Sequence, residues 1–204
     1  MITIIDYGLG NVKAFVNLYK KLAIPVIRAN GEKELRNATK LILPGVGAFD
    51  FAMERLNKSG MRQTLDELVI QNHIPVLGVC VGMQMLGRSS EEGSLPGLGW
   101  IDGEVKKLDS SVTEEHKPLP HMGWNEVKPI WDGDLFDGIE QCARFYFLHS
   151  YYLQCANREN ILAITDYFGE FACAVNAENV YGVQFHPEKS HQNGIRLLEN
   201  FAIL

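Results

Sequence analysis

The sequence has few cysteines and no excess of positive charge. Four cysteines among 204 residues form no C-x-x-C pair and are too sparse for a disulfide-stabilised scaffold. We therefore expect a reduced, cytoplasmic compartment. Lysine and arginine number 19 against 25 acidic residues, which gives a net charge of −6. Because no dense basic patch is present, we expect no nucleic-acid partner.

The first residues lack the long apolar run of a signal peptide or a membrane span. Their apolar stretch "MITII" ends at Asp6 and the turn residues that follow. We therefore expect no membrane association. With 46% hydrophobic and 22% charged residues, the chain has the composition of a globular protein with one sizeable core. No repeat or low-complexity tract divides it, so we predict a single domain over residues 1–204.

Cofactor motifs are also missing. The glycines of "YGLGN" have neither the G-x-G-x-x-G spacing of a dinucleotide site nor the lysine of a P-loop. No spacing of Cys, His and Asp residues indicates a metal site. The sequence therefore predicts chemistry by side chains alone, with no cofactor and no metal.

Strand-like and helix-like segments alternate in the first half of the chain. Such alternation predicts βαβ crossovers and a buried parallel sheet. The predicted strands cover residues 2–6, 24–29, 40–45 and 74–79, and the predicted helices cover 12–22, 49–56, 65–69 and 82–90.

Short strand-like segments joined by turns dominate from about residue 95. They lie at 99–108, 123–130, 144–155, 160–168 and 170–185, and a polar loop spans 109–118. Apolar residues recur at helical spacing in 191–204. We therefore predict an α/β fold with a central, mainly parallel sheet, added antiparallel strands, and helices on both faces.

The segment "GVCVGMQ", residues 78–84, places Cys80 between two glycines at a strand-to-helix turn. This is the G-x-nucleophile-x-G form of a nucleophile elbow, in which the glycines relieve steric clash. A thiol at a helix N-terminus is favoured as thiolate, and the free N–H groups there can bind an oxyanion. Taken alone, the segment fits a buried core cysteine about as well as a catalytic nucleophile.

A thiolate that cleaves an amide also needs a proton donor. "VQFHPEKS" supplies His186, with Glu188 two residues further on, after another buried-looking strand. A carboxylate beside an imidazole orients the ring and stabilises its charged form. Two glycines flank Val46 in "LPGVGAF" and leave backbone N–H groups free to face a ligand, although a plain strand-to-helix turn has the same form.

Together, "LPGVG", "GVCVGMQ" and "FHPEKS" resemble the class I glutamine amidotransferases over essentially all 204 residues. "DYGLGN", "PHMGWN" and "FLHSYY" narrow the resemblance to the glutaminase subunits of imidazole glycerol phosphate synthases, of histidine biosynthesis. The resemblance implies a flavodoxin-like fold. It also implies hydrolysis of L-glutamine with Cys80 as nucleophile, His186 as acid/base and Glu188 as orienting carboxylate.

The resemblance further implies a role for each remaining part of the site. The oxyanion hole would use the backbone N–H of Val81, where the family more often has leucine, and one from the Gly45–Val46 loop. The residues expected to hold glutamine are Gly47, Gln84, Ser150 and Tyr151. Gln84 lies one helical turn after Cys80, which places both on one helix face.

The resemblance also implies a partner. Ammonia would pass through a channel to a (β/α)8-barrel cyclase subunit in a heterodimer, because this chain is too short for a second catalytic domain. Interface candidates are Asn11, Met122, Trp124, Asn125 and Lys189. We interpret His149 as structural and His121 as part of the segment near the partner.

Other functions stay open at the level of sequence. The same glutaminase chemistry serves paralogous synthases that aminate a surface-polysaccharide sugar, and "LPHMGWN" does not separate the two. A non-catalytic binding protein on the same fold is disfavoured by the complete Cys80, His186 and Glu188 set. A related cysteine peptidase is disfavoured by Gln84 and the "HSYY" segment.

Overall fold

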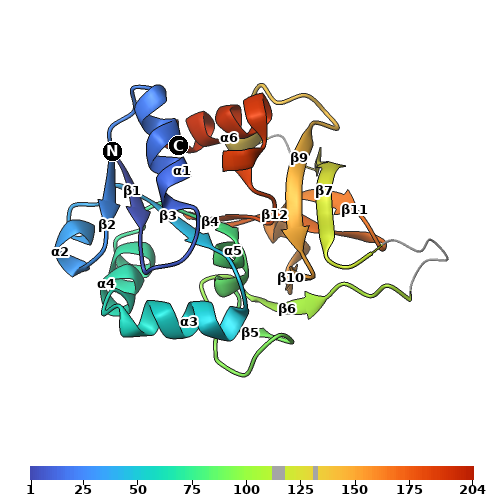
Figure 1. Cartoon of the computed structure of the whole chain (residues 1–204), viewed down its shortest axis with the longest axis horizontal. Coiled ribbons are helices and arrows are strands. Elements are labelled where there is room, and N and C mark those ends of the chain that lie inside the picture. Colours follow the sequence, from blue (N-terminus) through green and yellow to red (C-terminus); the bar gives the residue numbers. More distant parts are fainter. Residues whose placement is uncertain (112–117, 131–132) are drawn as a thin grey trace.

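An eight-stranded sheet forms the centre of the computed structural model, which describes residues 1–111, 118–130 and 133–204 (Figure 1). Its order is β2-β1-β3-β4-β13-β12-β11-β8, in which the first five strands are parallel and each later strand is antiparallel to its neighbour. The bounds are β1 Ile2–Ile5, β2 Val26–Ala29, β3 Lys40–Gly45, β4 Val76–Cys80, β8 Lys128–Pro129, β11 Ile161–Asp166, β12 Glu170–Ala177 and β13 Val180–Val183.

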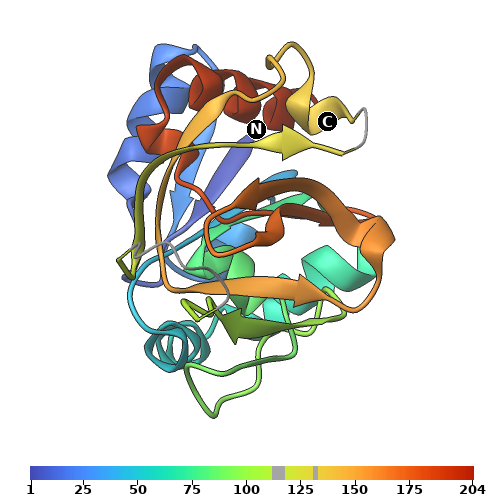
Figure 2. The same ribbon diagram turned by 90° about the vertical axis from the view of Figure 1, so that its right-hand side faces the viewer.

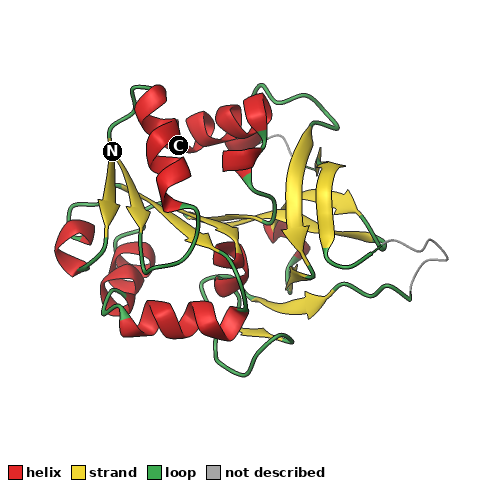
Figure 3. Ribbon diagram, in the orientation of Figure 1, coloured by secondary structure: helices red, strands yellow, loops and turns green. Residues whose placement is uncertain are grey.

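Helices cover both faces of this sheet (Figures 1 and 3). The helices α1 (Val12–Lys21) and α6 (His191–Ile203) lie on one face, and α3 (Phe49–Lys58) and α4 (Arg62–Asp66) lie on the other. A π-helical turn, Glu67–Gln71, continues α4, and two further short helices are α2 (Glu32–Leu35) and α5 (Val81–Met85). Because helices bury both faces, the parallel strands need continuous apolar runs, and every residue of β1 and β4 is buried.

Two small sheets stand beside the central one (Figure 2). The first has the order β10-β6-β5, formed by Tyr151–Cys155, Gly103–Lys107 and Ser89–Ser90. The second pairs β7 (His121–Glu126) with β9 (Arg144–His149) in antiparallel register. The chain passes from β9 to β10 at Ser150, so this residue lies where the two small sheets meet.

The predicted α/β fold with a mainly parallel sheet and helices on both faces is confirmed. Several details of the prediction are wrong. Residues 82–90 do not form one helix, because α5 ends at Met85 and Ser89–Ser90 pairs with β6. Residues 144–155 divide into strands of different sheets, and β13 is parallel to β4 instead of being an antiparallel addition.

The extent of the domain and of the polar loop was also predicted from the sequence. A single domain over residues 1–204 stays a prediction. Most of the polar loop predicted at 109–118 lies outside the described residues.

Three neighbouring parallel strands end at one edge of the central sheet. β3 and β4 are paired so that Gly45 stands opposite Cys80, and β13 pairs with the other side of β4 with Val183 opposite Val79. The chain that leaves β13 reaches His186 three residues later. This topology brings together the three segments that the sequence singled out, although they are far apart along the chain.

Candidate active site

Cys80 occupies a strained backbone position at the end of β4. Its φ of 56° and ψ of −114° are rare for a residue with a side chain, and such conformations cost about 1–3 kcal/mol. The neighbouring glycines make the turn possible. A Cβ atom on Gly82 would lie 1.9 Å from the carbonyl oxygen of Leu43, and one on Gly78 would lie 2.7 Å from the carbonyl oxygen of Gly82. The segment therefore has the geometry of a nucleophile elbow.

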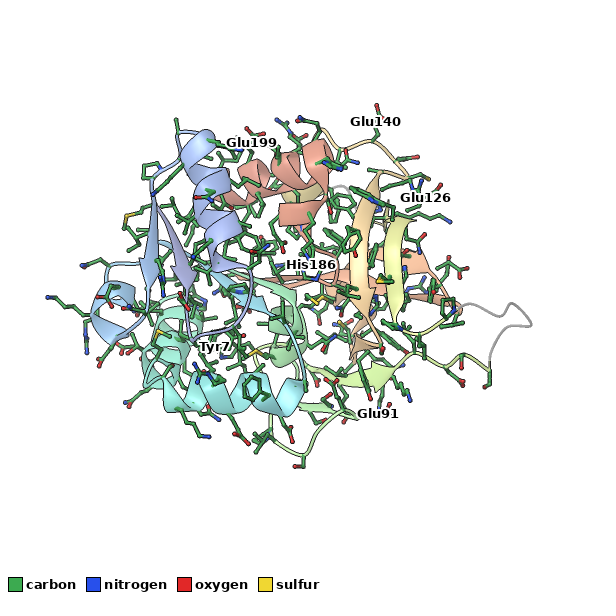
Figure 4. The ribbon with its side chains drawn as sticks, in the orientation of Figure 1. Tyr7, Glu91, Glu126, Glu140, His186 and Glu199 are labelled. Carbon is green, nitrogen blue, oxygen red and sulfur yellow. The ribbon has the colours of Figure 1, made fainter. Side chains whose placement is uncertain are left out.

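His186 and Glu188 lie beside this elbow. His186 Nδ1 is 3.0 Å from Glu188 Oε1, with only 5% and 1% of the two side chains exposed, and His186 lines the same cavity as Cys80. The backbone of His186 is held on both sides, because its N–H donates to the Tyr146 carbonyl and its carbonyl accepts from the Ser190 hydroxyl. Figure 4 places His186 near the centre of the molecule.

The charge state of His186 follows from its surroundings. Burial by itself lowers the pKa of this imidazole, but hydrogen bonds to Cys80 and Glu188 and the negative charges of these groups raise the pKa to about 10. The ring therefore carries a proton at neutral pH.

The Gly45–Val46–Gly47 loop lies directly across from the elbow. A Cβ on Gly45 would lie 2.3 Å from the backbone nitrogen of Gly82, so only glycine allows the two turns to touch. The Tyr7 hydroxyl donates to the carbonyl oxygen of Pro44 over 2.8 Å and anchors the start of the loop. Figure 4 shows Tyr7 on the segment that follows β1.

A cavity of about 310 Å³ opens onto Cys80. Its lining joins the three strand ends with the turn between β9 and β10 and consists of Val46, Gly47, Cys80, Val81, Gln84, Glu92, Pro120, Leu148, His149, Ser150, Tyr151, His186 and Lys189. A larger hollow of about 700 Å³ near Pro129 has no cysteine or histidine in its described lining. The smaller cavity therefore combines a nucleophile, an imidazole and polar groups in a volume suited to a small amino acid.

The structure brings all the predicted catalytic, oxyanion-hole and glutamine-binding residues to this cavity except Gly45 and Glu188. Gly45 lies against the elbow at Gly82, and Glu188 contacts His186. Gln84 Nε2 donates to the Tyr151 carbonyl over 2.9 Å and to Gln184 Oε1 over 3.1 Å.

Sequence reasoning missed two residues at this site. Gln184 is fully buried, and its Nε2 lies 3.8 Å from Cys80 Sγ. A glutamine within the apolar segment "VYGVQF" was the available signal. Glu92 lines the cavity, and its Oε2 accepts from the backbone N–H of Phe49 over 2.9 Å. It lies in a loop without any periodic pattern, so no local signal pointed to it.

The predicted interface residues fall into two groups. Asn11, Met122, Trp124 and Lys189 are exposed, and the Trp124 ring stacks on His191 with centroids 5.0 Å apart. Asn125 instead turns inward and donates to the Asp166 carbonyl over 2.8 Å. Met122 is 65% exposed on β7, which leaves an apolar side chain available to a partner.

In residues 1–111, 118–130 and 133–204, no group of three or more His, Cys, Asp or Glu side chains is placed to hold a metal ion. Over the same described ranges, no helix has the length and apolar character needed to cross a membrane.

Known proteins match the chain over nearly its whole length. The family model for class I glutamine amidotransferases matches residues 3–204. Imidazole glycerol phosphate synthase subunit HisH of Bdellovibrio bacteriovorus is 59% identical over 202 residues, 99% of each chain. The subunit HisH of Leptospira interrogans is 52% identical over 204 residues, the whole of both chains.

Solved structures agree with the fold. A crystal structure of a glutamine amidotransferase superposes with a TM-score of 0.75 at 16% identity, covering 100% of this chain and 99% of that one. The PurLQS structure from Thermotoga maritima gives a TM-score of 0.74 at 14% identity, covering 98% and 96%. At these identities the likeness concerns the fold alone.

The elbow, the parallel sheet and these matches lead to one assignment. The chain belongs to the class I glutamine amidotransferase family and, within it, to the HisH subunits of imidazole glycerol phosphate synthase. HisH subunits are the glutaminases of a synthase in histidine biosynthesis. The resemblance noted from the sequence motifs is thereby confirmed.

Proposed function

We propose that Cys80, His186 and Glu188 hydrolyse L-glutamine to L-glutamate and ammonia in this chain, which hands the ammonia to a cyclase subunit. The observation that carries the proposal is the strained Cys80 turn, which shares a small cavity with the imidazole of a buried His186–Glu188 pair. A structural cysteine needs no strained backbone, whereas a nucleophile presented above a sheet edge on an elbow has one.

The proposed reaction starts from a thiolate at Cys80 and an imidazolium at His186. The thiolate attacks the side-chain amide carbon of glutamine, and a C–S bond forms as the carbonyl oxygen becomes an oxyanion. His186 then gives its proton to the amide nitrogen, the C–N bond breaks, and ammonia leaves from a thioester. Neutral His186 next takes a proton from water, which attacks the thioester and releases glutamate and the thiolate.

The oxyanion is stabilised by backbone N–H groups on the two turns that touch at Gly45 and Gly82. The N–H of Val81 and one from the Gly45–Val46 loop are the proposed donors. Losing one such donor lowers kcat by about 10²–10³-fold. Because the two turns are in close contact, neither can move far relative to the other, and the proposed donors keep their spacing.

Recognition of free glutamine is assigned to the other wall of the cavity. Gly47, Ser150 and Tyr151 line it, and Gln84 projects from the helix that follows Cys80. Glu92 adds a carboxylate to this wall, and a carboxylate is suited to the α-ammonium group of the substrate. A peptide bond has no such free ammonium at the same place, which favours an amino acid over a peptide as substrate.

The proposed partner is a (β/α)8-barrel cyclase, bound at the exposed face that carries Asn11, Met122, Trp124 and Lys189. At neutral pH, ammonia released into water would be mostly protonated and unable to act as a nucleophile. Direct transfer through a channel avoids this loss. Lys189 lines the cavity and is exposed, so it belongs both to the cavity wall and to this face.

The proposal has two parts, ammonia production by this chain and ammonia use by the partner. Measuring synthesis by the complex from glutamine and from added ammonium salts tests them separately. Cys80→Ala and His186→Ala complexes should lose formation of imidazole glycerol phosphate from glutamine but retain it from added ammonium salts. Loss of both activities with the complex still assembled would contradict the division of labour. The paralogous sugar-aminating function predicts instead that the histidine-pathway cyclase neither binds the chain nor raises its glutaminase rate.

A further inference from the structure

A buried row of hydrogen bonds links β7 to the wall of the cavity. Asn125 Nδ2 lies 3.2 Å from His121 Nε2, and His121 Nδ1 lies 3.0 Å from His149 Nε2. His149 Nδ1 in turn lies 2.8 Å from the carbonyl oxygen of Tyr151. His121 and His149 are 2% and 6% exposed and stand directly opposite each other in the β7–β9 ladder.

Chemistry at the Tyr151 end fixes the direction of two of these bonds. A carbonyl oxygen only accepts, so His149 Nδ1 carries the hydrogen. Burial lowers the pKa of His149 to about 3, so the ring is neutral and its Nε2 is bare. His121 Nδ1 must therefore donate to His149.

The Asn125 end fixes the remaining bond independently. Asn125 Oδ1 accepts from the backbone N–H of Glu126 over 2.8 Å, and Nδ2 donates to the Asp166 carbonyl over 2.8 Å. These backbone partners determine which side-chain atom is nitrogen. The second hydrogen on Nδ2 then points to His121 Nε2, so all three bonds of the row donate toward the cavity.

Aromatic packing holds the middle of the row. The His121 ring lies between Tyr167, 4.0 Å away between centroids at 19°, and Phe147, 4.6 Å away at 18°. Two nearly parallel neighbours prevent the imidazole from tilting. Its two nitrogens are therefore held in line with Asn125 and His149.

The row ends on an atom that also organises Gln84. The Tyr151 carbonyl accepts from both His149 Nδ1 and Gln84 Nε2, and the other Nε2 hydrogen of Gln84 is directed to Gln184. Both hydrogens of the Gln84 amide are thus engaged within the protein. Its Oε1 is the group left to accept a hydrogen bond from a ligand in the cavity.

We propose that Asn125, His121 and His149 are positioning residues for glutamine, which act by fixing the Tyr151 carbonyl and, through it, the Gln84 side chain. The proposal rests on the proposed function of the cavity. It also gives β7 a second role, because the strand that starts the row carries Met122 and Trp124 on its exposed side. A partner bound there touches the element that orients the glutamine site.

Steady-state glutamine hydrolysis by the cyclase complex tests the proposal. His149→Phe keeps a planar ring but removes the donor to Tyr151, and we expect KM for glutamine to rise about 3- to 10-fold, the equivalent of one lost hydrogen bond, with kcat changed less. His149→Asn restores a donor at the δ position and should recover most of the KM. His73→Phe is the matched control, because His73 is exposed before β4, at the opposite end of that strand from Cys80.

Nitrogen-15 NMR of the isolated wild-type chain tests the same proposal without any activity or variant. Both His121 and His149 should be neutral and carry their hydrogen on Nδ1 at pH 7. An Nε2–H tautomer at His149, or an unchanged KM in His149→Phe, overturns the inference. A wild-type complex that does not hydrolyse glutamine overturns the proposed function instead, and the tautomer result still decides the direction of the row.

Discussion

Gly82 and Leu43 are in such close contact that the position of a Cβ on Gly82 falls 1.9 Å from the Leu43 carbonyl oxygen. The neighbouring atom belongs to the backbone of β3 and cannot turn aside as a side chain would. The contact fixes the distance between the strand that ends at the Gly45 loop and the turn that carries Cys80. Substitution at this glycine therefore has to move one of the two.

Gly82→Ala should accordingly reduce both stability and activity. We expect a loss of unfolding free energy of about 1–3 kcal/mol from overpacking, together with a fall in glutaminase activity, because the Cys80 turn is displaced. Denaturant unfolding and glutamine turnover measure the two effects. Gly133→Ala is the control, since its Cβ would have no atom within 4 Å and its φ is −145°. A stable and fully active Gly82→Ala protein would show that the turns are not coupled.

The four cysteines should differ sharply in reactivity. A glutamine-like chloroketone should label Cys80 and spare the other three. A small general alkylating reagent at pH 7 should also label Cys142, which is exposed. Burial raises the pKa of Cys173 and raises that of Cys155 to about 11, so both should stay unlabelled. Peptide mass spectrometry locates the modification, and glutamine-protectable labelling anywhere but Cys80 contradicts the proposed nucleophile.

His149 should make the fold sensitive to mild acid. Its pKa is depressed to about 3, mainly by burial and to a smaller extent by the cationic His186, despite the bond to Tyr151. The unfolded chain binds a proton at this residue below about pH 6.5, whereas the folded chain does not. The stabilising contribution is therefore present above pH 6.5 and is lost as the pH falls toward 3, by up to about 1.4 kcal/mol per pH unit.

Comparison with His149→Asn isolates this effect. Between pH 6.5 and 4.5, the wild-type free energy of unfolding should fall by about 2–3 kcal/mol more than that of the variant. Urea titrations at both pH values measure the difference. Parallel curves for the two proteins would mean that His149 takes up a proton without unfolding.

Tyr7→Phe should loosen the start of the oxyanion loop. The substitution removes the hydroxyl that donates to the Pro44 carbonyl, and this buried bond is worth about 0.5–1.5 kcal/mol. We expect a loss of stability in that range and a lower kcat for glutamine hydrolysis, because Pro44 precedes the loop. Tyr181→Phe is the control, since Tyr181 lies half-buried on β13. Equal kinetic effects in both variants would assign the loss to general destabilisation.

The exposed apolar residues of β7 should contribute to partner binding. Trp124→Ala and Met122→Ala should weaken the complex with the cyclase, and an anchor residue typically contributes about 2 kcal/mol or more, roughly 30-fold in Kd. Ile203→Ala, at an exposed position of α6, should leave the affinity unchanged. Titration calorimetry measures these values, and unaffected binding in both β7 variants would place the interface elsewhere.

Local patterns were sufficient to predict the parallel half of the fold. The apolar runs at 40–45 and 74–79 and the helical spacing at 12–22 and 49–56 correspond to β3, β4, α1 and α3 within a few residues. The elbow at Cys80 was readable because its requirements, two glycines after a strand, are local. Sequence matching also confirmed the family to which these motifs pointed.

Non-local pairing explains what the sequence did not reveal. β13 lies parallel beside β4. This pairing is made between segments about 100 residues apart, and no local sequence pattern indicates which strand β13 pairs with. The division of residues 144–155 at Ser150 is similar, because both halves are strand-like and only tertiary contacts assign them to different sheets. The His121–His149 pair depends on the β7–β9 register, which neither strand specifies by itself.

The chain passes from one small sheet to the other at Ser150, and this arrangement affects the size of ligand that the cavity can accept. β9 is paired with β7, and β10 is paired with β6, so the two sides of this joint belong to separate hydrogen-bonded ladders. The hydrogen bond from His149 Nδ1 to the Tyr151 carbonyl crosses this joint, so it sets the position of one ladder relative to the other at the cavity wall. The size of ligand that the cavity accepts therefore depends on the joint between β9 and β10, while the strand ends that carry the reacting groups stay where the central sheet holds them.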